Sequence, residues 1–515
     1  MSSEITKTNV NVCSNTKLVE KQKQIKAELG TLQAENILSV SAVPHISSKK
    51  AEQDKIYVEG YVYYTVLYSA ENSACETMSY KADFSDQIDI AGMSPNTNFI
   101  ISTQLLEVEP KPIKDDGILV ANTVINLRTC AVFTENIDCV NIEENSENLC
   151  TKMDETTLSS VLNAGVKNFE IGNRIELGKN FKRLINTSPT LASVDFYCDE
   201  TTLVVNGQIT TNVIYQSNDE TQNLLHKSVI HDFKHEIDIE NATNDAGVLA
   251  NMSLISDGIE IEADEESGEL VITYPLQVDY ILLQKHKLNT VIDAYCVDKE
   301  IKISTTSQNN INFLPLTKLE EQIHTSLIVD KEYESIEKII GYNSDNVVIT
   351  KVVAEQDVIN FEGIAYADIL YVSYDQNTEQ KANSSIVAEM PFSCKLNLIG
   401  INQDDEIILR AKIGDFDARV KRAQETDVFA QMKVQVFAIK KGIVNLTTEL
   451  EYGEEKLQND AGLSIYLMEK GASAWDIAKK LSITTEQLHE QNPTLTFPLE
   501  NNEKIVLYRQ IKNRN

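Results

Sequence analysis

The sequence predicts a multi-domain, mainly β protein in which three β-rich repeat domains, joined by connecting helices, precede a small C-terminal βααβ module. Three observations support this fold class. The chain has 515 residues, which is too long for one hydrophobic core and long enough for several. A pattern of glycine, tyrosine and phenylalanine recurs three times along it. From Leu463 onward the pattern changes to short strands and short helices with their own start signals.

The repeat begins with a glycine that is followed eight residues later by a tyrosine. A second part, Phe-x-x-x-[Ile/Leu]-[Asp/Asn]-[Ile/Leu], starts 16 to 21 residues after the tyrosine. Glycine is typical of close strand approach or a bulge, and large aromatic side chains are typical of a core. We therefore interpret the repeat as a packing signature rather than as a ligand site. Its glycines, tyrosines and phenylalanines are Gly60, Tyr68 and Phe84, then Gly207, Tyr215 and Phe233, and finally Gly363, Tyr371 and Phe392.

Each repeat closes on a stretch in which apolar and polar residues alternate. These stretches are ILVANTVINLRTCAV from Ile118, ELVITYPLQVDYIL from Glu269 and VFAQMKVQVFAI from Val428. Alternation at period two in segments rich in Val, Ile, Thr and Tyr predicts strands. We expect sandwich-like or barrel-like units of about 100 residues, covering residues 36–145, 175–290 and 335–445.

The segments between these domains have helical character in the sequence. They include SENLCTKMDETTLSSVLNAG from Ser146 and LTKLEEQIHTSLIVDKEY from Leu316. A further candidate helix, KLVEKQKQIKAELGTLQAE from Lys17, lies in an N-terminal segment of residues 1–35 that is predicted to be helical or flexible. These stretches are the predicted connecting helices.

The C-terminal module is predicted from local signals. A strand over residues 463–468 leads to a turn at Lys470 and Gly471, and Ser473 can cap a helix that carries Asp476 in its first turn. Thr484 and Gln487 have the spacing of a capping box for a second helix, which should end at Asn492-Pro493. A strand over residues 504–508 completes the unit. Trp475 lies at the margin of the apolar face of the first helix and is predicted to be partly exposed.

Charge and cysteine usage limit the possible functions. Lys and Arg number 46 against 78 Asp and Glu, which gives a formal charge of −32 at pH 7. Such a charge repels nucleic acids and anionic lipid headgroups. The chain shows neither a signal peptide nor a run of about 20 apolar residues, so we expect a soluble, cytoplasmic protein. The eight cysteines could form four disulfides, but free thiols are the expectation for such a chain.

No motif for catalysis is present. The sequence lacks a P-loop, Gly-x-Gly-x-x-Gly, Gly-x-Ser-x-Gly and His-Glu-x-x-His. His231 and His235 lie on a predicted strand, where four residues separate side chains by roughly 13 Å, too far for one metal ion. We therefore expect a non-enzymatic protein without a cofactor or a metal.

The C-terminal run resembles a LysM domain. The residues that match are Tyr466, Gly471, Trp475, Ile477, Ala478, Leu488, Asn492 and Pro493. The usual Gly-Asp-Thr is replaced by Gly471-Ala472-Ser473, the late glycine by Asn502 and the closing proline by Tyr508. LysM domains bind N-acetylglucosamine polymers, and these departures disturb the loops that line the sugar groove. The resemblance extends over residues 463–510.

Strand-rich repeats ahead of a terminal LysM domain resemble the spore-coat morphogenetic proteins of endospore formers, with SPOCS-type repeats; SpoVID is a more distant example. The resemblance implies a protein of the mother-cell cytoplasm, at the forespore surface and basal coat layer, that binds the coat ATPase SpoIVA through its LysM domain and promotes encasement. Other coat proteins or self-association are further partner candidates. Two alternatives remain open, a peptidoglycan binder and a self-assembling structural coat protein.

The C-terminal module also differs in charge from the rest of the chain. From Leu463 onward there are seven Lys and Arg against six Asp and Glu, so this part is close to neutral. A nearly neutral module with a tryptophan at its edge is a candidate centre of a protein interface. The predicted partner-binding residues are Lys470, Gly471, Ser473, Trp475 and Asn492.

Overall fold

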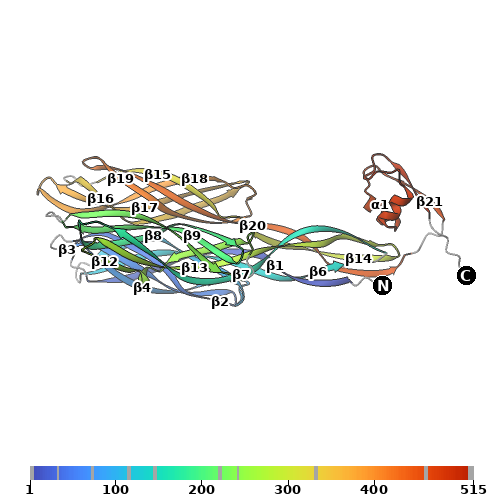
Figure 1. The fold of residues 1–515 in the computed structure, drawn as a ribbon, viewed down its shortest axis with the longest axis horizontal. Coiled ribbons are helices and arrows are strands. Elements are labelled where there is room, and N and C mark those ends of the chain that lie inside the picture. Colours follow the sequence, from blue (N-terminus) through green and yellow to red (C-terminus); the bar gives the residue numbers. More distant parts are fainter. Residues whose placement is uncertain are drawn as a thin grey trace.

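The computed structural model describes residues 5–31, 34–70, 75–112, 117–142, 148–218, 223–240, 243–329, 334–456 and 462–508. Within these ranges the fold is mainly β, as predicted. The strands fall into three consecutive sets, followed by a small module with two helices (Figure 1). α1 and α2 have eight and seven residues, and no helix in the described ranges is long and apolar enough to cross a bilayer.

The strands of the three sets have the following bounds. The first set contains β1 (Ile5–Thr31), β2 (Ala34–Glu52), β3 (Lys55–Ala70), β4 (Cys75–Asp89), β5 (Asn98–Pro112) and β6 (Ile118–Ile142). The second contains β7 (Leu149–Glu176), β8 (Phe181–Asp199), β9 (Thr202–Ser217), β10 (Leu224–Asp238), β11 (Gly247–Leu254), β12 (Glu260–Asp264) and β13 (Glu269–Cys296), with a 3-10 turn at Ser256–Gly258. The third contains β14 (Lys299–Phe313), β15 (Thr317–Ile328), β16 (Glu334–Glu355), β17 (Val358–Asp375), β18 (Gln380–Asn397), β19 (Glu406–Arg422) and β20 (Glu425–Glu455).

Each set forms two antiparallel sheets with the same plan. One sheet is a meander of three successive strands, in the orders β2-β3-β4, β8-β9-β10 and β16-β17-β18. In the other sheet the first and last strands of the set pair over most of their length, β1 with β6 and β7 with β13. In the third set the first strand is divided into β14 and β15, which both pair with β20. The division falls at Leu314-Pro315-Leu316, because proline cannot donate a hydrogen bond to the ladder.

The two sheets of a set pack face to face around a hydrophobic core. In the first set Ile25 and Leu29 of β1 lie in one cluster with Val62 and Tyr64 of β3. Two buried hydrogen bonds join facing sheets in equivalent ways. The Tyr64 hydroxyl donates to Thr123 Oγ1 of β6 at 2.8 Å, and the hydroxyls of Thr211 and Tyr274 lie 2.7 Å apart between β9 and β13. Each set is therefore a small sandwich.

The glycine, tyrosine and phenylalanine of the repeat lie at equivalent positions of the three meanders. Gly60, Gly207 and Gly363 are on the middle strands and pair with Phe84, Phe233 and Phe392 of the next strands. A Cβ atom on these glycines would lie within 2.7 Å of the phenylalanine Cζ atom. All three phenylalanines and all three tyrosines are buried. These contacts are those expected of a packing signature, in which the ring covers the glycine of the neighbouring strand.

The predicted connecting helices are wrong. Residues 17–31 belong to β1, residues 149–165 to β7 and residues 317–328 to β15. Residues 146–147 and 330–333 of the predicted segments lie outside the described residues. Their many Lys, Glu and Gln residues are good helix formers, but pairing with a distant strand overrides that preference. In β1, Ile25, Ala27 and Leu29 are buried while the residues between them are exposed. The N-terminal segment is thus an integral strand of the first set, and residues 1–4 and 32–33 of it lie outside the described residues.

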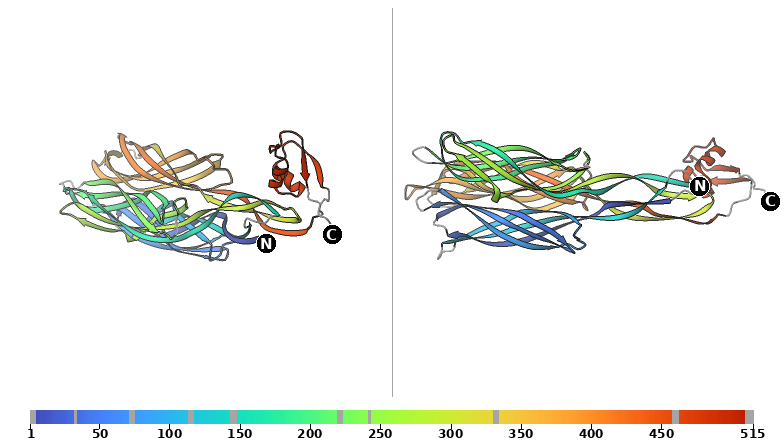
Figure 2. Two further views of the ribbon diagram at one scale, coloured as in Figure 1. Left: turned by 45° about the vertical axis from the view of Figure 1, so that its right-hand side comes forward. Right: turned by 60° about the horizontal axis from the view of Figure 1, so that its bottom comes forward.

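Beyond the sandwiches, the first and last strands of each set continue as two-stranded ribbons. The ribbons consist of residues 5–15 with 133–142, 149–160 with 284–296, and 299–313 with 439–455. They run side by side and form an extension on one side of the body, which we call the arm (Figures 1 and 2). Val140, Val291, Ala294 and Leu450 pack together near its end. The C-terminal module lies at this end of the arm, which we call the tip (Figure 2).

Side chains also join the three sets to one another. Lys49 of β2 forms a mostly buried ion pair with Asp279 of β13. Arg410 of β19 donates from Nη1 to the carbonyl oxygen of Ala250 in β11 at 2.7 Å. The His226 ring of β10 fills the space beside Gly341 of β16. The three sandwiches therefore form one body rather than separate beads.

Candidate functional site

The C-terminal module consists of β21 (Leu463–Met468), α1 (Ala474–Leu481), α2 (Thr485–Gln491) and β22 (Glu503–Tyr508). β21 and β22 form a two-stranded antiparallel sheet. Met468, Ile477, Leu481, Leu488 and Ile505 belong to a compact core. Both predicted caps are present, since Ser473 accepts a hydrogen bond from the backbone of Asp476 and Thr484 forms a capping box with Gln487.

Three of the predicted binding residues form the turn between β21 and α1. Gly471 has a φ of +89°, in the region that favours glycine, and its N–H donates to the carbonyl oxygen of Leu499 at 2.8 Å. The Lys470 N–H donates to Asn502 Oδ1 at 2.9 Å. The Ser473 hydroxyl donates to Asp476 Oδ2 at 2.7 Å. The polar groups of this turn are therefore largely used to hold the module together, and the Lys470 side chain remains exposed.

Asn492 lies in the interior of the module and not on a binding face. It is only 6% exposed. Its amide donates to the carbonyl oxygens of Leu488 and Val506 at 3.1 and 3.0 Å, and its Oδ1 accepts from the Val506 N–H at 2.8 Å. The side chain joins the end of α2 to β22, so its contacts here are structural.

Trp475 is half-buried, and the residues that cover it belong to the arm. Its indole N–H donates to Asp293 Oδ2 of β13 at 2.8 Å. Its ring meets the Tyr295 ring edge to face, with centroids 4.9 Å apart. Lys479 lies one turn further along α1, and its Nζ donates to Asp293 Oδ1 at 2.6 Å. The edge of α1 that carries Trp475 and Lys479 therefore contacts the tip of the arm.

Tyr295 and Asp293, at the tip of the arm, contact the module directly. Tyr295 is 3% exposed and is part of the module's own core cluster. Its hydroxyl donates to the carbonyl oxygen of Ile483 at 2.8 Å. Burial opposes ionisation of Asp293, but hydrogen bonds from Lys479 and Trp475 outweigh it, so the pKa of this carboxyl is lowered. Asp293 is thus a charged acceptor for both α1 residues.

A second surface of the module is exposed in the part of the chain that the structure describes. Leu463, Ile465 and Leu467 alternate along β21 and are 53%, 62% and 69% exposed. Tyr466 and Met468 point the other way and pack in the core. Tyr508, which pairs with Leu463, is 62% exposed. We call the three residues Leu463, Ile465 and Leu467 the apolar strip.

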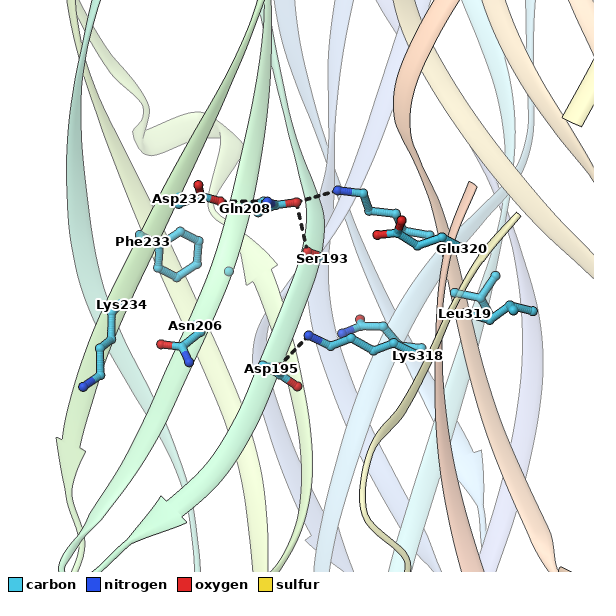
Figure 3. A pocket seen from close by; sticks show the side chains of 14 residues that line it. Ser193, Asp195, Asn206, Gln208, Asp232, Phe233, Lys234, Lys318, Leu319 and Glu320 are labelled. Atoms are coloured by element: carbon cyan, nitrogen blue, oxygen red, sulfur yellow. Dashed lines mark hydrogen bonds and ion pairs between the residues drawn. The ribbon is translucent and has the colours of Figure 1, made fainter. Parts of the chain in front are cut away.

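A shallow groove of about 610 Å³ lies between the second and third sets (Figure 3). Gly207 and Phe233 lie on one side of it, and Lys318 and Glu320 of β15 on the other. Several charged groups are paired within the groove. Lys318 Nζ lies 2.6 Å from Asp195 Oδ2. The Gln208 amide donates to Asp232 and accepts a hydrogen bond from Lys433 (Figure 3). The contacts of Lys318 with Asp195 and of Lys433 with Gln208 join the two sets. In the described ranges no cluster of three or more His, Cys, Asp or Glu could hold a metal ion.

The structure therefore divides the predicted site. Lys470, Gly471 and Ser473 share one turn, Trp475 contacts the arm, and Asn492 is internal. Sequence reasoning missed Asp293 and Tyr295, since no local pattern marks a strand end as the receptor for a helix far along the chain. It also missed the apolar strip, although the sequence LSIYLM places apolar residues on both faces of β21, and only one of these faces can pack in the core of the module.

Comparison with known families agrees with the strand sets. Residues 33–111 and 335–421 match the family model described as SipL, SPOCS domain. These ranges begin at β2 and β16 and end within β5 and β19, so each contains a meander and the strand after it. No curated protein and no solved structure matches the chain. The two matched ranges occupy equivalent positions of the first and third sets, so in these regions the chain is similar to the SipL family, which links it to the spore coat.

Proposed function

We propose that the chain is a non-enzymatic morphogenetic scaffold of the spore coat that binds the coat ATPase SpoIVA through its C-terminal module, which we interpret as a LysM domain. In this role it would promote coat localisation and encasement around the forespore from the mother-cell cytoplasm. The SPOCS matches support the link to the coat. The arrangement of the chain supports a scaffold, because the arm holds a small module away from the body of strands (Figure 2).

The observation that carries the proposal is the apolar strip. Single exposed apolar residues are ordinary on protein surfaces, but a contiguous group favours an interaction site. Ile465 and Leu467 expose more than half of their surface on one face of a two-stranded sheet. The module is also nearly neutral, whereas the whole chain carries −32. A protein partner can approach this face without the repulsion that the acidic body would exert on an anion.

The turn geometry favours a protein partner over a glycan. Sugar recognition needs polar groups that are free to bond to hydroxyls and amides. In this turn the Ser473 hydroxyl is bonded to Asp476, and Asn502 is bonded to the backbone of Lys470. Sedimentation of the full chain with purified peptidoglycan tests the glycan alternative, and strong co-sedimentation would support it over the proposal.

The direct test is the affinity of the full chain for SpoIVA with a charge placed on the strip. Ile465→Arg should weaken binding by at least tenfold, since an interface residue whose loss costs about 1.4 kcal/mol or more changes affinity by that factor. Ile443→Arg is the matched control, because Ile443 is 71% exposed but lies on β20 of the arm. Isothermal titration calorimetry measures both. Equal affinity of the two variants would contradict the use of the strip.

Trp475→Glu tests the other edge of the module in the same assay. We expect it to abolish binding if the partner uses α1, with circular dichroism showing that the fold is intact. Retained binding would remove Trp475 from the partner-binding residues.

A further inference from the structure

The edge of α1 that carries Trp475 is covered by the chain's own arm. Asp293 accepts from both the Trp475 indole and the Lys479 ammonium group. Tyr295 packs its ring against Trp475 and bonds to the backbone after α1 through its hydroxyl. The Trp475 ring and the Lys479 ammonium group are side chains of the kind that bind protein partners, and here both contact residues of the same chain.

The contact extends to the C-terminal end of α1. Lys456, which directly follows β20, donates to the carbonyl oxygen of Cys296 at 2.9 Å and to the Ser482 hydroxyl at 3.1 Å. Cys150 of β7, paired with Tyr295 in the same ribbon, also packs against the module's core. Residues from β13 and the end of β20 therefore contact α1 from Trp475, near its start, to Ser482 at its end, and Cys150 of β7 packs against the same core. This convergence is a built surface and not a single chance contact.

The ion pair between the module and the arm is accessible to solvent, so the two parts can separate. The side chains of Lys479 and Asp293 are 43% and 29% exposed, so water and salt reach the ion pair. By contrast, the ion pair inside the body, Lys49 with Asp279, is only 17% and 10% exposed. The module is joined to the arm by a few polar bonds and by the packing of Tyr295 and Cys150 against its core, whereas the sets of the body share a larger apolar core.

We propose that the tip of the arm is an intramolecular lock that covers Trp475 and Lys479, so that the α1 edge meets a protein partner only when the module leaves the arm. This inference rests on the proposed function, because it takes the module as the partner-binding element. The apolar strip stays uncovered in the locked form and offers the first contact. Opening of the lock then exposes the second edge, and the partner's affinity depends on the fraction of molecules that are open.

The lock itself can be measured without any partner. Trp475 is the only tryptophan of the chain, so its emission reports the environment of the α1 edge alone. Asp293→Lys places a like charge beside Lys479 and should open the lock. Its matched control is Glu300→Lys, which makes the same charge change at an exposed residue of β14 near the tip. We expect a red shift of the emission and greater quenching by acrylamide for Asp293→Lys, and neither change for Glu300→Lys.

Salt gives the same test on the unmodified chain. Raising NaCl from 0.05 to about 1 M shortens the screening length severalfold, so it should shift the emission of the wild-type chain toward that of Asp293→Lys. Tyr295→Ala, which removes the aromatic contact and leaves the charges, should shift the emission even at low salt. If neither variant nor salt changes the emission or the quenching, the module is not locked by these residues and the inference is wrong.

The regulatory role is tested by SpoIVA affinity of the same full-length proteins. If the locked form dominates by about ten to one, Asp293→Lys should bind SpoIVA about tenfold more tightly than the wild type and than Glu300→Lys. A changed emission with unchanged affinity would overturn the role of the lock, because the partner would then use the apolar strip alone. Absence of SpoIVA binding by every form, including Asp293→Lys, would instead overturn the proposed function, and with it the regulatory role.

Discussion

The body of strands and the C-terminal module are held together in opposite ways. In the body, Ile25 pairs with Thr123, Ile171 with Tyr274 and Leu319 with Val434, so each set closes only when distant segments meet. In the module, caps and turns join residues three or four positions apart. Non-local pairing makes the body's stability depend on close packing between strands and sets. The module closes within residues 463–508 and takes Tyr295 and Cys150 of the arm into its core. Substitutions in the body and in the module should therefore lower the free energy of unfolding of different parts of the chain.

The largest expected effect is on the body, at the glycine of the repeat. In Gly363→Ala the new Cβ would lie 2.4 Å from the Val348 carbonyl oxygen and 2.6 Å from Phe392 Cζ. The strands cannot separate without loss of their hydrogen bonds, so we expect the free energy of unfolding to fall by about 3 kcal/mol. Urea unfolding followed by far-UV circular dichroism measures the loss.

Gly442→Ala is the control for this substitution. Gly442 lies on the arm part of β20, where the nearest atom to a new Cβ is 3.6 Å away. It should change the free energy of unfolding by less than about 0.5 kcal/mol. Equal losses in the two variants would show that the close approach at Gly363 is not the cause.

A somewhat smaller effect is expected from pH at the contact between the second and third sets. Burial lowers the pKa of His226 from 6.5 to about 4, and its Nε2 has no hydrogen-bond partner in the described part of the chain. Because the folded pKa lies below the unfolded one, the unfolded chain binds the proton more readily. His226 therefore does not lower the free energy of unfolding above about pH 6.5. As the pH falls from 6.5 to 4, the free energy of unfolding decreases by at most about 3 kcal/mol because of this residue.

The pH effect can be assigned to His226 by substitution. His226→Gln should remove most of the decrease in thermal stability between pH 6.5 and 4, as measured by circular dichroism. His231→Gln, on the opposite face of β10, should leave the decrease in place. If His231→Gln alone removes it, the contact beside Gly341 is not the pH-sensitive one.

The same contrast explains how much of the fold the sequence predicts. The strands β3, β9 and β17 are recognisable because glycine, tyrosine and alternating apolar residues mark them. The strands β1, β7 and β15 are not, because their exposed positions hold Lys, Glu and Gln, which favour helices in isolation. Only the distant partner strand decides their conformation, and that partner is not visible in a local pattern.

In the candidate site, local features were predictable and long-range ones were not. The caps at Ser473 and Thr484 follow from spacing alone. The half-buried state of Trp475 agrees with its place at the margin of the apolar face, but its partners Asp293 and Tyr295 come from another domain of the chain. The alternation in β21 predicts two faces but not which of them is buried. The packing of Tyr466 and Met468 in the core shows that the face with the apolar strip is the exposed one.

The smallest expected effect is within the module, at Asn492. Asn492→Ala removes the side chain that accepts from Val506 N–H and donates to two backbone carbonyl oxygens. Leaving these buried groups without partners should lower the stability of the module by about 2 kcal/mol. Asn501→Ala, at an exposed asparagine of the same module, should have little effect. Urea unfolding monitored by Trp475 emission should show the loss while the circular dichroism of the strands is unchanged, because the module's closure is local. A shift of both transitions would show instead that the arm and the module stabilise each other strongly.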